Sequence, residues 1–185
     1  MQEIRFSQPT NKYVWIECTI TLNNEEIFPI DGVASIAEAL ASFGNELTAG
    51  QDCIRQRFFN SIYSVSGVED ITDFKFSVTK NPTDDPTLVL DSGSVVGETS
   101  PGLMDMSGTL LLSNDIVSGM SVYTSGFAKV STVRQIFSEV QFRSNTDVFD
   151  VADALDFGGY APANVGINAN EIARFDVARI TVNLA

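Results

Sequence analysis

The clearest pattern in the chain is an alternation of apolar and polar positions between Tyr13 and Leu22. Successive side chains of an extended strand point to opposite faces, so this period of two predicts a strand with one buried face. A second alternation, over Ala178 to Leu184, predicts a terminal strand that we expect in the same sheet. The apolar positions of the first strand are Val14, Ile16, Cys18, Ile20 and Leu22.

Two helical patterns follow the first strand. After Asp31, which is placed to act as an N-cap, apolar side chains recur at intervals of three and four. We expect Gly50 to separate this helix from a second one, and Gly67 to end the second helix. Residues 68–78 then return to an alternating, strand-like pattern. The two apolar stripes are Val33, Ile36, Ala37, Leu40, Phe43 and Leu47, and Ile54, Phe58, Ile62 and Val65.

The composition changes near Lys80. The segment Asn81-Pro82-Thr83-Asp84-Asp85-Pro86 predicts a linker, and short apolar runs from Thr87 to Phe142 predict a small all-β unit. A short helix is expected within 146–155.

These patterns predict an α+β fold: a small mixed sheet with two packed helices, in the order strand-helix-helix-strand and a final strand, carrying a β-rich insertion. In this interpretation residues 1–80 and 165–185 form one domain, and residues 81–164 form the inserted unit.

Charge and composition exclude several classes of function. Acidic residues number 24 and basic residues 11 in a chain of 185, which gives a net charge of −13 that would repel nucleic acid. The chain has no histidine, which excludes serine–histidine and cysteine–histidine catalysis. No apolar run approaches the ~20 residues that span a bilayer, and Met1 to Phe6 lack the regions of a signal peptide. We therefore expect a soluble protein folded in the cytoplasm.

Three groups of residues bear on metal and cofactor binding. Cys18 and Cys53 are too few for a four-ligand zinc site and are expected as buried, unpaired thiols. Asp147, Asp150 and Asp153 would share one side of a short helix and could hold a hard cation. A solvated acidic face near a helix N-terminus explains the same spacing, and we favour it. The glycines match neither a dinucleotide fingerprint nor a phosphate-binding loop, so we expect no cofactor, no metal and no catalytic residue.

The aromatic residues suggest a contact surface. Trp15 and Tyr13 lie on the less apolar face of the first strand, which makes them candidate interface residues for a neighbouring element or a partner subunit. A carbohydrate-binding surface is the alternative for such side chains. An enzyme of the carboxylate-pair type, acting on cell-wall polymers, has only the abundance of acids in its favour.

The order of several short motifs is similar to that of the C-terminal domain of the baseplate J-like family of contractile phage tails. In that family an extended strand leads into a helix, a glycine precedes a second helix, and a Gly-Val turn introduces the next strand. Besides the strand over 13–22, the matching segments are Leu47-Thr48-Ala49-Gly50-Gln51-Asp52, Arg57-Phe58-Phe59-Asn60-Ser61-Ile62, Val65-Ser66-Gly67-Val68-Glu69-Asp70-Ile71, Ile167-Asn168-Ala169-Asn170-Glu171-Ile172-Ala173-Arg174-Phe175 and Ile180-Thr181-Val182.

The resemblance implies a non-enzymatic structural subunit of a bacteriophage or prophage tail baseplate. Its partners would be other tail or baseplate proteins, and itself as a homo-oligomer, in a virion assembled in the host cytoplasm. Two features depart from the family: the sequence does not include the long N-terminal region of such wedge proteins, and residues 81–164 exceed the usual connection. The alternative is a tail module in which this insertion binds a glycan or protein of the host surface.

Overall fold

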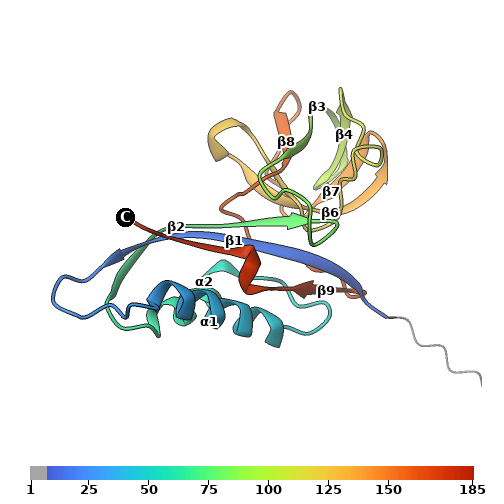
Figure 1. Cartoon of the computed structure of the whole chain (residues 1–185). Helices are drawn as coiled ribbons and strands as arrows, with labels where there is room; N and C mark the ends of the chain where they lie inside the picture. Colours follow the sequence, from blue (N-terminus) through green and yellow to red (C-terminus); the bar gives the residue numbers. More distant parts are fainter. Residues whose placement is uncertain (1–7) are drawn as a thin grey trace, which may run out of the picture.

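A four-stranded sheet carries two helices on one face and a closed six-stranded barrel on the other (Figure 1). The structure is a computed structural model that describes residues 8–185. The signal-peptide prediction concerns Met1 to Phe6, which lie outside the described residues.

The central strand of the sheet is β1 (Thr10–Leu22), the alternating segment of the sequence. Along one edge it pairs antiparallel with β2 (Val68–Thr79). Along its other edge lie two short strands in tandem, β9 (Glu171–Arg174) and β10 (Ile180–Leu184), both parallel to β1. The terminal strand therefore joins the sheet of the first strand, as its pattern predicted.

Helices α1 (Gly32–Glu46) and α2 (Arg55–Tyr63) cover the apolar face of this sheet. Both helices were predicted by their apolar stripes, and Asp31 does occupy the N-cap position of α1. Its side chain, however, makes no capping hydrogen bond. Phe58 of α2 lies at the centre of the layer, because its ring centroid is 5.2 Å from that of Phe76 and 5.5 Å from that of Phe175.

The barrel is built from the segment between β2 and β9. Its strands are joined in the closed order β3-β4-β7-β6-β5-β8, and closure leaves no strand edge unpaired within the barrel. Apolar side chains fill its interior, among them Phe142 and Phe157, which meet edge to face. The strands are β3 (Val89–Ser100), β4 (Leu103–Ser107), β5 (Ser121–Tyr123), β6 (Val130–Ser138), β7 (Gln141–Ser144) and β8 (Ala154–Gly158).

The predicted α+β class is wrong, because the chain is mostly β, with 42% strand and 17% helix. The barrel accounts for the difference: its strands are rich in Ser, Thr and Gly, and their pairing around a closed ring is not visible in local periodicity. The apolar run over 109–112, one of the short runs of the predicted all-β unit, forms no strand: 109–110 are irregular and 111–112 lie in a turn.

The short helix expected within 146–155 is also wrong. Residues 147–153 form a loop, and Ala152 has a φ of 79°, which a right-handed helix cannot contain. The carboxylate of Asp153 accepts a hydrogen bond from the backbone N–H of Asp150 at 2.8 Å, so the polar side chain closes a turn where a helix was expected.

The chain returns from the barrel to the sheet through residues 159–170, which we call the strap. Ala161 and Phe76 exchange backbone hydrogen bonds of 2.9 and 3.1 Å, which attach the strap to β2. Val165 and Cys53 exchange another pair of 2.9 and 3.1 Å, which attach it to the segment before α2. These two bridges tie the barrel to the sheet-and-helix layer.

A substitution at Gly44 of α1 tests how tightly the helices pack on the sheet. A Cβ atom at Gly44 would lie 2.4 Å from the Phe175 ring, so Gly44→Ala should overpack the core. Alanine favours helix by about 1 kcal/mol over glycine. Overpacking costs about 1–3 kcal/mol, and because the new methyl group would lie far inside contact distance of a buried ring we expect the upper end of this range. The net loss in the free energy of unfolding is then about 2 kcal/mol, measured by urea titration.

The matched control is Gly97→Ala on β3, where the nearest atom would lie 3.4 Å from the new methyl group. It should change stability by less than about 0.5 kcal/mol. Equal stability of the Gly44 variant and the unmutated chain would contradict this packing.

Candidate functional site

Tyr13 and Trp15 lie together on the face of β1 opposite the helices, and both are half-buried. The Trp15 Nε1–H donates a hydrogen bond to the Thr79 hydroxyl at 2.8 Å, which fixes the indole against β2. The Arg179 guanidinium carbon lies 5.4 Å from the Tyr13 ring centroid, within cation–π range. Both aromatics thus have intramolecular partners, and their role at an interface stays a prediction.

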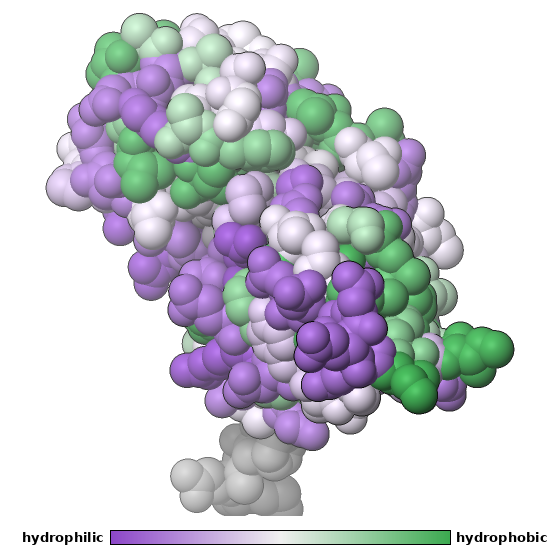
Figure 2. All heavy atoms as spheres, turned by 90° about the vertical axis from the view of Figure 1, so that its left-hand side faces the viewer, coloured by the Kyte–Doolittle hydropathy of each residue, from purple (hydrophilic) through white to green (hydrophobic). Residues whose placement is uncertain are grey.

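The loop between β1 and α1 exposes large aliphatic side chains. Ile27 is 89% exposed and Ile30 is fully exposed, with Val33 of α1 partly exposed beside them. We call these three residues the apolar tip. Figure 2 faces this end of the molecule and shows hydrophobic surface projecting next to a hydrophilic region. Sequence reasoning missed the tip, because Ile27 and Ile30 precede the helical stripe and follow no period.

The loop that carries the apolar tip is anchored by its other residues. The Glu26 carboxylate accepts hydrogen bonds from the Gly67 N–H at 3.0 Å and from the Ser66 hydroxyl at 3.3 Å. Phe28 packs so closely on Gly67 that a Cβ there would lie 2.9 Å from the Phe28 Cα. Glu26 and Phe28 therefore hold the backbone, while Ile27 and Ile30 point away from the protein.

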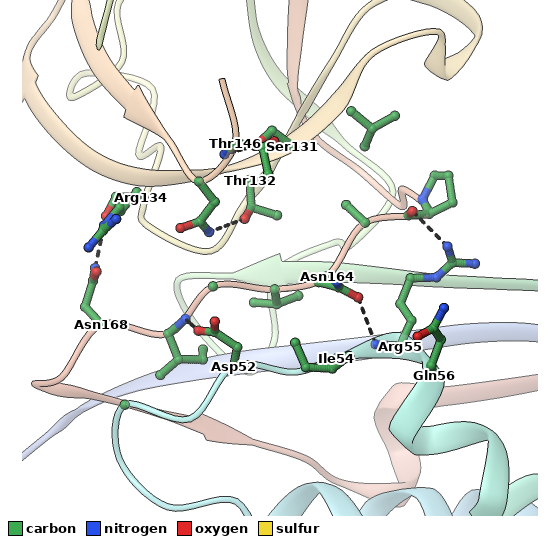
Figure 3. A pocket seen from close by; sticks show the side chains of 18 of the residues that line it. Asp52, Ile54, Arg55, Gln56, Ser131, Thr132, Arg134, Thr146, Asn164 and Asn168 are labelled. Carbon is green, nitrogen blue, oxygen red and sulfur yellow. Dashed lines mark hydrogen bonds between the residues drawn. The ribbon is translucent and has the colours of Figure 1, made fainter. Parts of the chain in front are cut away.

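A cleft of about 920 Å³ opens between the barrel, the strap and the start of α2 (Figure 3). A smaller hollow of about 520 Å³ continues from it toward β1 and shares two of its lining residues, Arg134 and Asn168. The polar side chains lining the cleft include Arg55, Gln56, Thr132, Arg134, Asn164 and Asn168. Of these two hollows, the cleft is the larger.

The barrel side of the cleft presents oriented hydroxyl and amide groups. The Asn145 side-chain N–H donates to the Thr132 hydroxyl at 2.6 Å. The Thr146 hydroxyl donates to the Ser131 hydroxyl at 2.8 Å. These side chains come from β6 and from the loop after β7, so the barrel frame fixes their positions.

The opposite side is built from the strap and the start of α2. The Arg55 backbone N–H donates to the Asn164 side-chain oxygen at 2.9 Å, and its guanidinium Nη1 donates to the Pro162 carbonyl at 2.9 Å. Burial lowers the pKa of Arg55, an effect that the Asp73 carboxylate opposes. Arg55 is thus a partly desolvated cation at the edge of the cleft.

A buried ion pair lies at the end of the smaller hollow. Lys12 of β1 is 6% exposed and Glu171 of β9 is 7% exposed, and their Nζ and Oε1 atoms are 3.3 Å apart. The Ser118 hydroxyl and the Asn168 backbone N–H also donate to the Glu171 carboxylate. Because Ser118 belongs to the barrel segment, this network joins barrel, strap and sheet.

The two partners of this pair respond differently to burial. Burial lowers the pKa of Lys12, although Glu171 opposes the change. Burial alone would raise the pKa of Glu171, but the hydrogen bonds from Ser118 and Asn168, with the charge of Lys12, bring it below its ordinary value. The ionised carboxylate is therefore the form that this network stabilises.

The structure separates the three aspartates that could have held a cation. Asp147 is exposed, whereas Asp150 and Asp153 each place a carboxylate oxygen 2.6 Å from the Lys129 ammonium. Among the described residues no group of three acids or cysteines is arranged to bind a metal.

Cys18 and Cys53 are buried and unpaired, as predicted. Burial raises the pKa of Cys18 to about 12 and raises that of Cys53 as well, so both thiols keep their protons at neutral pH. Over residues 8–185, neither helix has the length and apolar character needed to cross a membrane.

No protein-family model matches this chain, and no curated protein matches its sequence. The case for a function therefore rests on the geometry of the apolar tip and the cleft, and on the order of the sequence motifs.

The Glu171 network makes stability depend on pH. A carboxyl group with a lowered pKa in the folded state stabilises it above the unfolded value, about pH 4.3. That contribution is lost as the pH falls through the folded-state pKa. Glu171→Gln leaves Lys12 buried without its counter-charge, so it should lower the free energy of unfolding by about 3 kcal/mol at pH 7.

Urea titrations between pH 7 and pH 3 should show the gap between this variant and the unmutated chain narrowing below about pH 4. The control, Glu38→Gln, removes an exposed carboxylate of α1 and should leave stability nearly unchanged at each pH. A gap for Glu171→Gln that stays constant over this range would contradict the network.

Proposed function

We propose that this chain is a non-enzymatic structural subunit of a bacteriophage or prophage tail baseplate, which acts by binding neighbouring subunits. The observation that carries the proposal is the apolar tip: Ile27 and Ile30 are held in solvent by an anchored loop. Exposed aliphatic side chains gathered at one place are typical of surfaces that another protein covers. The order of the sequence motifs, which resembles that of the baseplate J-like family, indicates that the assembly is a tail baseplate.

The loop's anchoring supports an assembly role in a second way. A binding surface that is already ordered loses less conformational entropy when its partner docks. Glu26 and Phe28 hold the loop before any partner arrives, so the tip is presented in one arrangement. An assembly subunit benefits from such a rigid face.

Charge favours a particular kind of partner. The net charge of −13 opposes close approach of identical chains at low salt, and the exposed acids Glu25 and Asp31 flank the apolar tip. Another tail or baseplate protein with an apolar pocket surrounded by basic side chains would complement the apolar tip and its flanking acids. A homo-oligomer would form more readily as salt screens the repulsion. Nucleic acid is disfavoured by the same charge, and the proposed location is the baseplate of a virion assembled in the host cytoplasm.

The second candidate, a tail module that binds the host surface, is supported by the polar cleft. The aromatic residues Trp15 and Tyr13 support it less, because both are half-buried and have intramolecular partners. The two roles are compatible, because the apolar tip and the cleft are formed by different residues.

The test is complementation of a phage or prophage from which the gene has been deleted. The unmutated chain should restore complete tails and be found at the baseplate by immunogold labelling. The double variant Ile27→Ser/Ile30→Ser removes the apolar contact, so we expect at least a tenfold loss of complete tails, counted by electron microscopy. Because both side chains are exposed, its free energy of unfolding should change by less than about 0.5 kcal/mol.

The control is Val151→Ser, which removes a side chain that is 60% exposed on the barrel segment and should restore tails normally. Complete, infectious particles from the deletion strain would refute the baseplate role. Normal tails with the double variant would refute the part assigned to the apolar tip.

A further inference from the structure

The cleft between barrel and strap is lined by more basic than acidic side chains, although the chain as a whole is acidic. Arg55 and Arg134 both line it, and Asp52 is the only acid among its described lining residues. Asp52 is already engaged, because its carboxylate accepts the Ile167 N–H at 2.8 Å. Within residues 8–185 neither arginine forms a salt bridge with another described residue. A cleft with two unneutralised guanidinium groups in a chain of net charge −13 favours an anionic ligand.

The neutral groups of the cleft suit a ligand rich in hydroxyls. Side-chain amides and hydroxyls both donate and accept hydrogen bonds, as sugar hydroxyls do. The barrel contributes the exposed side chains of Asn145 and Thr146, and the facing side contributes those of Gln56 and Asn164. Thr132 is buried and accepts the Asn145 hydrogen bond, so it positions Asn145. A peptide that binds as an added strand would require an open strand edge, and the barrel strands along this wall are paired on both sides.

The shape of the cleft favours an extended ligand. Figure 3 shows Arg134 at one end and Arg55 at the other, with Thr132 and Asn164 between them. A single phosphate is too compact to meet both arginines, whereas acid groups spaced along a chain can reach each. The volume of about 920 Å³ lies within the range of sites for small organic ligands.

We propose that this cleft binds a short acidic oligosaccharide, whose carboxylates pair with Arg55 and Arg134 and whose hydroxyls pair with the amide and hydroxyl groups between them. Both walls are held before the ligand arrives: the strap by its bridges to β2 and to Cys53, the barrel by strand pairing. Arg134 is the more informative residue to change. Its side chain is exposed, and the hydrogen bond that it accepts from the Asn168 side chain involves only its backbone carbonyl.

The first experiment screens the intact chain on a glycan array that carries uronic-acid and sialic-acid oligosaccharides beside neutral oligosaccharides of the same length. Acidic glycans should be retained above the neutral ones. Isothermal titration calorimetry with the strongest acidic glycan should then show at least tenfold weaker binding for Arg134→Gln. Binding should also weaken as NaCl is raised, because ion pairs are screened.

The matched control is Arg57→Gln, which removes the same charge from an exposed position of α2 outside the cleft and should change the affinity less than twofold. Failure of every acidic glycan to bind above the neutral ones would overturn the proposal. Equal losses of affinity in the Arg134 and Arg57 variants would also overturn it, since binding would then depend on the net charge of the protein and not on the cleft. Inositol hexakisphosphate is the test for a general anion site. If it binds as tightly as the acidic glycan and also loses affinity in the Arg134→Gln variant, the cleft recognises negative charge and not a sugar, which would overturn the proposal.

Discussion

The strap, residues 159–170, is the constraint on which the rest of the structure depends. It exchanges backbone hydrogen bonds with β2 through Ala161 and with the segment before α2 through Val165. It then leads into β9, where Glu171 forms the buried pair with Lys12. Without this segment the only chain connection between barrel and sheet would be the linker after β2. The strap makes barrel and sheet a single frame and also forms one wall of the cleft.

This frame separates two surfaces with different chemistry. The apolar tip, at the loop before α1, suits burial against another protein subunit, where aliphatic side chains leave water. The cleft suits an anionic, hydroxyl-rich ligand, because two arginines and only one acid are among its described lining residues, in a chain of net charge −13. In the proposed role, the tip would hold the subunit in its assembly while the cleft stays open to a glycan.

Sequence patterns predicted the elements that depend on local periodicity, such as β1 and the two helices. They could not predict barrel closure, because β3 pairs with β8 across some sixty residues of sequence, as between Ser94 and Ala154. The expected helix within 146–155 failed for a similar reason: Lys129 and a local turn engage Asp150 and Asp153. The cleft was equally hidden, since its residues come from α2, the barrel and the strap.

Native-state hydrogen exchange tests the central claim, that the strap joins barrel and sheet into one cooperative unit. The amides of Phe76, Ala161, Cys53 and Val165 form the four bridging hydrogen bonds. If the claim is right, these amides exchange only on global unfolding, with the same free energy as the buried amides of β1. Fast exchange of these four amides, while β1 and the barrel strands remain protected, would show that the strap opens alone and would contradict the account.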